Sequence, residues 1–218
     1  MSRAAAQRCT IAGPVGPIEA VIETPAGLAA EQVTRFAVVC HPHPQHGGTM
    51  DNKVVTTLAR SFHVLGLPTL RFNYRGVGAS AGQYAEGIGE TDDALAVLAH
   101  GRALYPSAQP WLAGFSFGGR VALRVATHAT AADVARLVTV APAFTGYYET
   151  PADVPVPACP WLVVQGDADE VIDAAEVIAW AQALQPAPQL AVLAGVGHFF
   201  HGQLDALQQQ VLDWVAAT

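Results

Sequence analysis

The amino-acid sequence predicts an α/β fold with a mostly parallel central sheet and helices on both faces. Short, continuous apolar runs alternate with segments of helical periodicity, which is the pattern of successive β–α units. Of the 218 residues, 51% are hydrophobic and only 13% are charged, which suits strands buried on both faces. Single α/β domains reach about 200–250 residues, so one domain over residues 1–218 is expected.

The first strands are expected close to the N-terminus. The segment Ile11–Thr24 is interrupted by two Gly-Pro pairs and predicts two short strands joined by a turn. The later strands are predicted from apolar runs that Gly, Pro or polar residues bound: Phe36–His41, Pro68–Tyr74, Pro110–Phe115, Leu137–Ala141, Trp161–Gln165 and Leu190–Ala194.

Helical segments are predicted between and after these strands, at Asp51–Leu65, Glu90–Leu104, Phe117–Ala129, Ala174–Leu184 and Gly202–Ala217. Asp51 or Asn52 is expected to cap the first of them. Parallel sheets bind ligands at the carboxyl ends of their strands. The residues directly after each strand are therefore the candidates for chemistry.

Charge and composition argue against several classes of protein. The formal net charge is −7 and no basic run is present, so a nucleic-acid partner has no electrostatic support. Met1–Thr10 lacks the apolar core of a signal peptide, and no apolar run is long enough to span a bilayer. Cys9, Cys40 and Cys159 are an odd number at unrelated spacings, which predicts reduced thiols. We therefore expect a cytoplasmic protein that acts on a small molecule, needs no cofactor and has an oligomeric state the sequence leaves open.

The pentapeptide Gly114-Phe115-Ser116-Phe117-Gly118 joins a predicted strand to a predicted helix. This is the G-x-S-x-G pattern in its required strand–turn–helix context. Gly114 and Gly118 lack the Cβ atoms that would crowd a sharp turn. The helix N-terminus beside Ser116 favours developing negative charge. A nucleotide-binding turn is the alternative, but the segment lacks G-x-G-x-x-G and Gly-Lys-Ser/Thr. Ser116 is the predicted nucleophile.

Two later strands end in loops that carry an acid and a base. Asp167, Asp169 and Glu170 follow the strand Trp161–Gln165, and His198 follows the strand Leu190–Ala194. Nucleophile, acid and histidine thus occur in the chain order known for one large class of serine hydrolases. From position alone, any of the three carboxylates could be the acid.

The motifs resemble those of the α/β-hydrolase family. Gly166-x-x-Asp169-x-Val171 is similar to the family's acid loop, and Gly195-x-Gly197-His198-Phe199 is similar to its histidine loop. The resemblance implies that Asp169 orients His198, which takes the proton of Ser116. Asp167 would then bond within its own turn, and His201 would begin the final helix.

Three histidines occur in the stretch His41-Pro42-His43-Pro44-Gln45-His46. Prolines 42 and 44 keep the backbone extended, and no Cys, Asp or Glu lies within the stretch to complete a metal site, so a metal is not expected. The resemblance implies an oxyanion hole made by the backbone N–H groups of His43 and Phe117. Because proline has no N–H, His43 is the only donor between the two prolines.

Two further segments resemble parts of the same family. The stretch His41–Lys53 is similar to a small group of bacterial α/β-hydrolases, and Arg71–Ser80 is similar to the family's Arg-Gly-x-Gly-x-Ser loop, which buttresses the site. About 20 residues separate Ala141 from Trp161, too few for a helical cap, so no sizeable lid is expected. The aromatic residues of this connection, Phe144, Tyr147 and Tyr148, either line an acyl pocket or simply pack the connection.

The resemblance implies a serine carboxylesterase-like enzyme that cleaves a small or soluble carboxylic ester through an acyl-enzyme intermediate. Thioesterase, peptidase and acyltransferase activities remain open, because one triad serves all of them. A catalytically silent binding or scaffold protein with the same fold is the alternative of another class.

Overall fold

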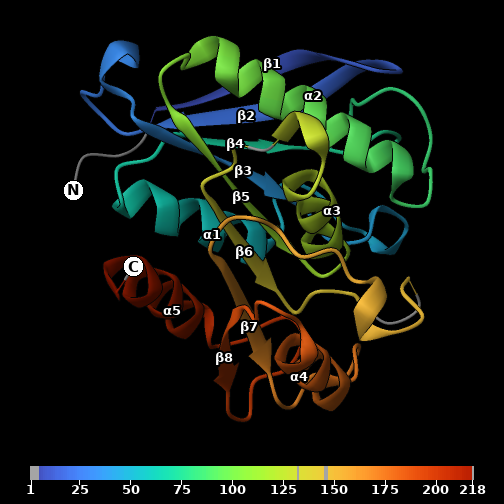
Figure 1. Cartoon of the computed structure of the whole chain (residues 1–218). Helices are drawn as coiled ribbons and strands as arrows, with labels where there is room; N and C mark the ends of the chain where they lie inside the picture. The colour runs from blue at the N-terminus through green and yellow to red at the C-terminus, as the bar shows by residue number, and fades with distance from the viewer. Residues whose placement is uncertain (1–4, 132, 145–146, 218) are drawn as a thin grey trace.

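The computed structural model describes residues 5–131, 133–144 and 147–217, and its strands form one eight-stranded sheet (Figure 1). The strands are β1 (Ala5–Gly13), β2 (Gly16–Thr24), β3 (Arg35–Cys40), β4 (Thr69–Phe72), β5 (Gln109–Phe115), β6 (Arg136–Val140), β7 (Trp161–Gly166) and β8 (Gln189–Leu193). The α-helices are α1 (Lys53–Val64), α2 (Ile88–Leu104), α3 (Phe117–Ala126), α4 (Ala174–Ala183) and α5 (Leu204–Ala217). Short 3-10 helices are η1 (Ala30–Gln32), η2 (Pro44–His46), η3 (Ala129–Ala131) and η4 (Pro151–Asp153).

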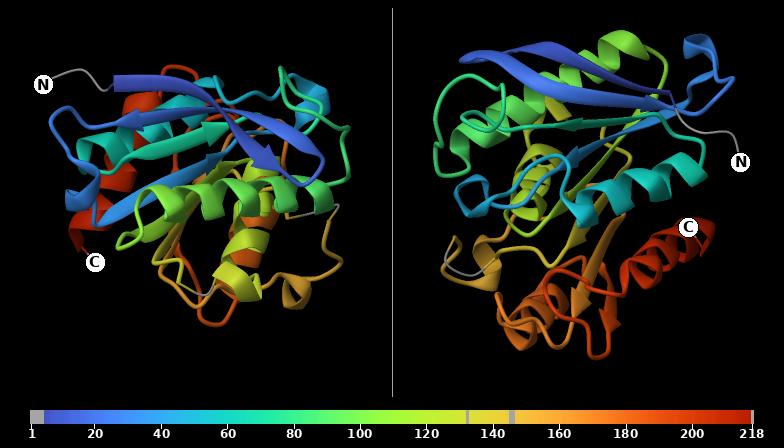
Figure 2. Two further views of the ribbon diagram at one scale, coloured as in Figure 1. Left: turned by 90° about the horizontal axis from the view of Figure 1, so that it is seen from above. Right: turned by 180° about the vertical axis from the view of Figure 1, so that it is seen from behind.

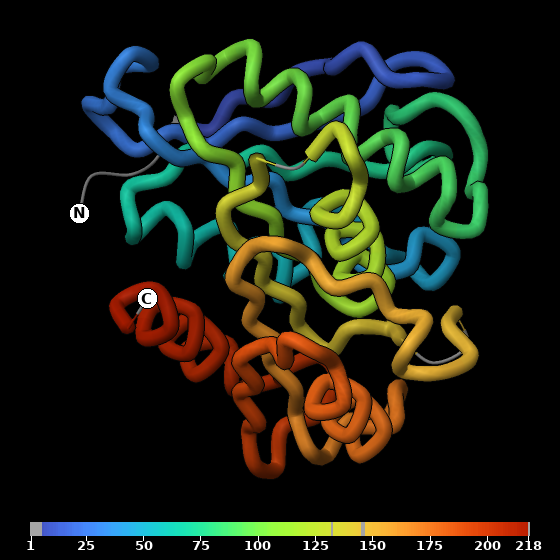
Figure 3. Tube along the Cα trace, viewed as in Figure 1, coloured from blue at the N-terminus to red at the C-terminus, as the bar shows by residue number. Residues whose placement is uncertain are grey.

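The sheet has the order β1-β2-β4-β3-β5-β6-β7-β8. The pairs β1–β2 and β2–β4 are antiparallel, and every pair from β4 onward in that order is parallel. The trace in Figure 3 places the N-terminal hairpin and the C-terminal strand at opposite edges. The predicted mostly parallel sheet is confirmed.

Helices cover both faces of the sheet, as predicted (Figure 2). One buried cluster joins alternate strand residues such as Val38 to α2, α3 and α4, and a second joins Val39 and its equivalents to α1 and α5. Neighbouring residues of one strand therefore belong to different clusters, because side chains alternate between the faces of a strand. Because both faces of the sheet are covered, the central strands are apolar at nearly every position.

The N-terminal hairpin is longer than the sequence predicts. β1 begins at Ala5, which pairs with Thr24, so the strand starts six residues before Ile11. Its first residues show no apolar alternation, because β1 is an edge strand that pairs only with β2. Arg8 on this strand forms an exposed ion pair with Glu19 at 3.2 Å.

Two helices begin at positions that local capping explains. Asn52 Oδ1 accepts the N–H of Val54 at 2.9 Å, so Asn52 rather than Asp51 caps α1. α2 starts at Ile88, two residues before the predicted Glu90. Gly87 adopts φ 85° there, and the buried Glu90 carboxylate accepts N–H groups of the turn, including that of Gly87 at 2.7 Å.

The described residues between β6 and β7 form no lid. The described part of this connection contains η4 and no longer helix, which confirms the lidless architecture. Within the described residues, no helix combines the length and the apolarity needed to cross a membrane.

Candidate active site

Ser116 occupies the turn between β5 and α3. Its backbone has φ 56° and ψ −120°, an unusual conformation for a residue with a side chain. The turn is fixed on both sides, because the Ser116 N–H donates to Val140 O at 2.9 Å and the Ser116 carbonyl accepts the N–H of Gly119 at 2.9 Å. This backbone places the hydroxyl at the first turn of α3.

The two flanking glycines are required by close backbone approach. A Cβ atom on Gly114 would lie 2.0 Å from the carbonyl oxygen of Gly118. A Cβ atom on Gly118 would lie 2.4 Å from the carbonyl oxygens of both Cys40 and His41. The elbow therefore packs against its own strand and against the end of β3, as the absence of side chains at these positions predicts.

Ser116, His198 and Asp169 lie together at the carboxyl ends of β5, β8 and β7. Nε2 of His198 is 3.1 Å from Oγ of Ser116, and Nδ1 of His198 is 2.8 Å from Oδ2 of Asp169. The ring of His198 is almost wholly buried. The three predicted residues thus form one continuous chain of hydrogen-bonding groups.

The Asp169 carboxylate is held by donors on both oxygens. Oδ1 accepts the N–H groups of Val171 and Ile172 at 2.9 and 2.8 Å, and Oδ2 accepts Nε2–H of Gln165 at 3.1 Å. Burial raises the pKa of Asp169, but the hydrogen bonds from His198, Ile172 and Val171 outweigh it and lower the pKa below its ordinary value. An ionised Asp169 accepts a hydrogen bond from Nδ1–H of His198, which leaves Nε2 without a proton as the acceptor for the serine hydroxyl.

Asp167 and Glu170 serve the backbone of the histidine loop rather than the ring. Oδ1 of Asp167 accepts the N–H of Gly195 at 2.6 Å, and Oε2 of Glu170 accepts the N–H of His198 at 3.0 Å. The expectation that Asp167 bonds within its own turn is therefore wrong. The pairing of β7 and β8 continues into the loops, since Asp167 also donates its N–H to Leu193 O.

Aromatic rings enclose His198 on two sides. Its ring centroid lies 4.9 Å from that of Phe115 and 5.1 Å from that of Phe199. Phe200 turns into the core instead and is fully buried. His201 is exposed and precedes α5, which begins at Leu204, so the expectation that it starts the final helix is wrong.

The loop after β3 meets Ser116 in a cleft of about 100 Å3. The lining residues come from this loop, the elbow and the two loops after β7 and β8: Pro42, His43, His46, Gly47, Gly48, Asn52, Ser116, Val171, His198 and Phe199. No backbone acceptor among the described residues takes a hydrogen bond from the N–H of His43 or Phe117. Both N–H groups that are predicted to bind an oxyanion thus belong to residues beside Ser116. Neither donates to a backbone carbonyl of the described residues.

Of the three clustered histidines, His43 contacts both Tyr84 and His46. Nδ1 of His43 accepts the N–H of Gln45 at 3.2 Å, its Nε2 lies 3.2 Å from the Tyr84 hydroxyl, and its ring stacks on His46. Burial, followed by the positive charges of His46 and Arg120, lowers the pKa of His43. Within the described parts of the chain, no three His, Cys, Asp or Glu side chains are arranged to hold a metal ion.

The sequence does not predict the environment of His41. Its side chain is fully buried, Nε2 accepts the N–H of Tyr74 at 3.1 Å, and Nδ1 lies 2.7 Å from the carbonyl oxygen of Pro42. Burial lowers its pKa to about 3. The sequence feature that could have indicated this buried histidine is its position directly after a buried strand and before Pro42 and Pro44.

The segment Arg71–Ser80, which is expected to support the site, is held by side-chain hydrogen bonds. Ser80 Oγ donates to Asn73 O at 2.7 Å and accepts the N–H of Glu19 at 2.9 Å. The buried Arg75 guanidinium makes a two-point contact with Asp93, at 3.0 and 2.8 Å. These are structural contacts, as the resemblance of this loop implies.

Phe144, Tyr147 and Tyr148 do not line the cleft. Phe144 is fully buried and stacks on Trp180, with ring centroids 6.5 Å apart. Tyr147 covers the guanidinium of Arg120, which lies 3.5 Å from the centre of its ring. For Phe144, packing is thus the correct one of the two interpretations.

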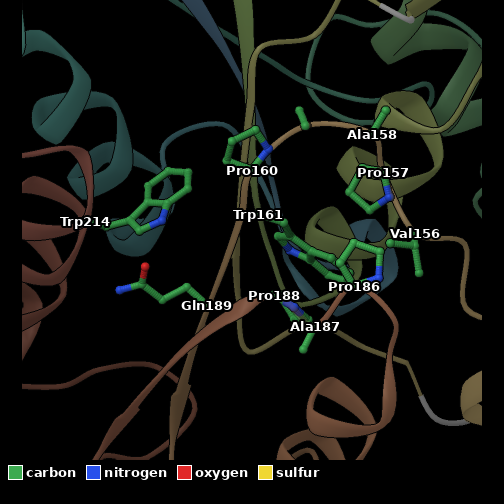
Figure 4. A pocket seen from close by; sticks show the side chains of 11 residues that line it. Val156, Pro157, Ala158, Pro160, Trp161, Pro186, Ala187, Pro188, Gln189 and Trp214 are labelled. Carbon is green, nitrogen blue, oxygen red and sulfur yellow. The ribbon is translucent and has the colours of Figure 1, made fainter. Parts of the chain in front are cut away.

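A larger hollow of about 370 Å3 lies away from Ser116 (Figure 4). It opens where β7 and β8 begin, at the opposite end of these strands from Asp169 and His198. Prolines and tryptophans make up most of its wall, and among the described residues that line it Cys159 is the only titratable one. The smaller cleft is therefore the candidate active site.

The sequence matches the family model of the S33 serine aminopeptidases over residues 36–157, more than half of the chain. The chain belongs to this family of α/β serine hydrolases. The matched segment includes His43 and Ser116 and ends before Asp169 and His198.

Solved structures and a curated relative extend the similarity over almost the whole chain. An α/β serine hydrolase homologue from Coxiella burnetii is 44% identical, with a TM-score of 0.85 over 95% of this chain and 96% of that one. A lidless α/β serine hydrolase from Xanthomonas campestris is 41% identical, with a TM-score of 0.87 over 100% and 95%. An uncharacterised protein of Rickettsia prowazekii is 29% identical over 92% of this chain and 86% of its own length. The protein is thus a lidless α/β serine hydrolase.

Proposed function

We propose that this serine hydrolase cleaves small or soluble carboxylic esters through an acyl-enzyme on Ser116. The observation that carries the proposal is the hydrogen-bonded chain from Asp169 through His198 to Ser116, which reaches a cleft open to substrate. Asp169 and Ser116 lie on opposite nitrogens of one imidazole, the arrangement that a general base between an acid and a nucleophile needs.

The proposed reaction has two half-reactions. Ser116 Oγ bonds to the ester carbonyl carbon while its proton passes to Nε2 of His198. The tetrahedral intermediate then collapses, and the departing alcohol takes that proton. Water repeats the sequence on the acyl-enzyme, losing its proton to His198 and releasing the carboxylic acid and a free Ser116. Asp169 holds the ring in its tautomer and stabilises the transient imidazolium.

The N–H groups of His43 and Phe117 are proposed to bind the oxyanion. His43 follows the carboxyl end of β3, and Phe117 follows that of β5. Phe117 is also the first residue of α3. A helix N-terminus favours negative charge. Loss of one such donor typically costs about 10²–10³ in rate.

The cleft supports a small, uncharged substrate. Its volume is about 100 Å3, and Val171 and Phe199 contribute partly exposed apolar side chains to its lining. Among the described residues, no Asp or Glu lines the cleft to bind a substrate's α-ammonium group, which favours an ester over an N-terminal peptide. Without a lid, the enzyme is expected to show no activation by micelles or emulsions.

A fluorophosphonate probe tests the enzyme class, with Ser116→Ala as the control. Folded wild-type protein is expected to be labelled on Ser116 and the variant to remain unlabelled. Absence of labelling in folded wild-type protein would support the silent binding or scaffold alternative. A chelator is expected to leave the rate unchanged, whereas a metal-dependent hydrolase would lose activity.

A second assay determines which type of bond the enzyme cleaves. p-Nitrophenyl esters of two to twelve carbons, an acyl thioester and an aminoacyl p-nitroanilide would be compared by kcat/KM. The short esters are expected to be the best substrates. A higher value for the thioester or the anilide would assign the protein to thioesterases or peptidases instead.

A further inference from the structure

We propose that His41 is a positioning residue that aims the N–H of His43 into the cleft beside Ser116. The inference rests on the proposed function, in which that N–H binds the oxyanion. Its basis is the bonding of the His41 ring, which lies outside the cleft and does not touch Ser116.

The hydrogen bonds of His41 fix its tautomer. The backbone N–H of Tyr74 can only donate, so Nε2 of His41, 3.1 Å away, is an acceptor without a proton. In a neutral imidazole the proton is then on Nδ1, which donates to the carbonyl oxygen of Pro42 at 2.7 Å. Complete burial against Tyr74, with ring centroids 4.2 Å apart, keeps the ring neutral.

The bond to Pro42 orients the next peptide group. The Pro42–His43 peptide is trans, so its carbonyl oxygen and the N–H of His43 point in opposite directions. The carbonyl oxygen is held by the fully buried His41 ring, and a Cβ atom on Gly48 would lie 2.1 Å from it, so the space around it is filled. The N–H of His43 therefore points away from the His41 ring, and in the proposal it faces the cleft that Pro42 and His43 line.

The same residue is locked to the elbow through its backbone. The carbonyl oxygen of His41 lies where a Cβ of Gly118 would approach it to 2.4 Å, so the first turn of α3 packs directly on His41. Rotation of the Pro42–His43 peptide would point a carbonyl at the developing oxyanion. Such a rotation has to break the Nδ1–H bond of a ring that Tyr74 holds in place.

Two substitutions separate the two ring nitrogens. In His41→Asn, the side-chain amide occupies the region of Nδ1 and retains a donor for Pro42, but it is too short to reach Tyr74. In His41→Gln, the amide reaches the region of Nε2 and retains an acceptor for Tyr74, and the donor near Pro42 is lost. Each variant thus loses one buried hydrogen bond, which matches them in stability to a first approximation.

The kinetic expectation differs between the two variants. With p-nitrophenyl acetate, His41→Gln is expected to lower kcat about 10²–10³-fold, and His41→Asn less than about 10-fold. KM is expected to change little in either, because the oxyanion forms only in the transition state. Binding of a trifluoromethyl ketone, which forms an anionic adduct with serine, should weaken in parallel with kcat. Equal losses in the two folded variants, or no loss in His41→Gln, would overturn the proposal.

A measurement on wild-type protein keeps the inference testable where a variant fails to fold. Histidine-selective ¹⁵N NMR is expected to show His41 neutral, with its proton on Nδ1, at pH 7. A proton on Nε2 would overturn the proposal. Failure of Ser116 to react with fluorophosphonate would overturn the proposed function instead, and leave this tautomer unchanged.

Discussion

Glu170 and His198 are joined through the backbone, since Oε2 of Glu170 accepts the N–H of His198 at 3.0 Å. The ring of the same histidine turns to Asp169, whose Oδ2 lies 2.8 Å from Nδ1. Two neighbouring carboxylates thus act on one residue in different ways. Glu170 holds the backbone of the histidine loop in place, and Asp169 fixes the tautomer and rotation of the His198 ring.

This division predicts unequal effects of two isosteric substitutions. Asp169→Asn is expected to lower kcat about 10⁴-fold, because the amide favours the wrong tautomer of His198. Glu170→Gln retains an oxygen acceptor for the backbone N–H and is expected to cost less than about 10-fold. Steady-state kinetics on p-nitrophenyl acetate measures both. A larger loss in Glu170→Gln would show that the acid has been assigned to the wrong residue.

The glycines after Ser116 predict a second contrast. In Gly118→Ala, the new Cβ lies 2.4 Å from two carbonyl oxygens at the end of β3, which is closer than packed atoms tolerate. The variant is expected to lose about 1–3 kcal/mol of unfolding free energy and most of its activity, because the β3 loop must move away from the elbow. Urea denaturation and the ester assay measure the two losses.

Gly119→Ala is the matched control for that substitution. Its Cβ would lie 3.3 Å from Pro142, a contact that a small shift relieves. Both stability and kcat are expected to stay close to those of the wild type. Equal damage by the two substitutions would indicate that any alanine is harmful in the first turn of α3.

Phe199 predicts the acyl-chain preference. It lines the cleft with a 44% exposed side chain, so its removal widens the site with little damage to the core. Phe199→Ala is expected to raise the octanoate-to-acetate ratio of kcat/KM about tenfold, since added methylene groups gain room. Val64→Ala, an exposed position at the end of α1, serves as control. An unchanged ratio in Phe199→Ala would place the acyl chain elsewhere.

The buried His41 predicts how stability depends on pH. Its pKa is lowered to about 3 in the folded state, against about 6.5 for a free histidine. Between these values the unfolded chain binds the extra proton, so the contribution of His41 is fully present above about pH 6.5 and is lost progressively toward pH 3.

Urea denaturation at pH 7.5 and pH 4.5 measures this dependence. Between these pH values the wild type is expected to lose on the order of 2–3 kcal/mol more unfolding free energy than His41→Asn does. Parallel losses in the two proteins would mean that the folded protein accepts a proton on His41.

The sequence predicted the parts of the molecule that depend on local pattern and chain order. The parallel strands could be recognised because residues such as Val38 and Val39 are both buried, on opposite faces. Ser116 could be chosen from its strand–turn–helix context, and His198 from its place in the loop after the last strand; Asp169 was distinguished from Asp167 and Glu170 by the resemblance to the family's acid loop. β1 was missed in part because an edge strand such as Ala5–Gly13 needs no apolar alternation.

Contacts between loops could not be predicted in the same way. The bond of Asp167 to Gly195 and that of His41 to Tyr74 join residues 28 and 33 positions apart. Their partners depend on which loops become neighbours at the end of the sheet. The bond from His41 to Pro42 involves adjacent residues, but the rotation of the ring that allows it is set by Tyr74.

Ser116 and His198 are separated by 82 residues of chain. The backbone contacts of Ser116 and Gly118 are with β3, β6 and α3 and not with β7 or β8, so we expect the elbow to form before those last two strands pair. A chain folded only that far holds Ser116 in its turn without His198 beside it. The rate at which a fluorophosphonate labels Ser116 during refolding is therefore expected to rise when β7 and β8 pair and bring His198 to the serine. Such labelling would follow the last stage of folding.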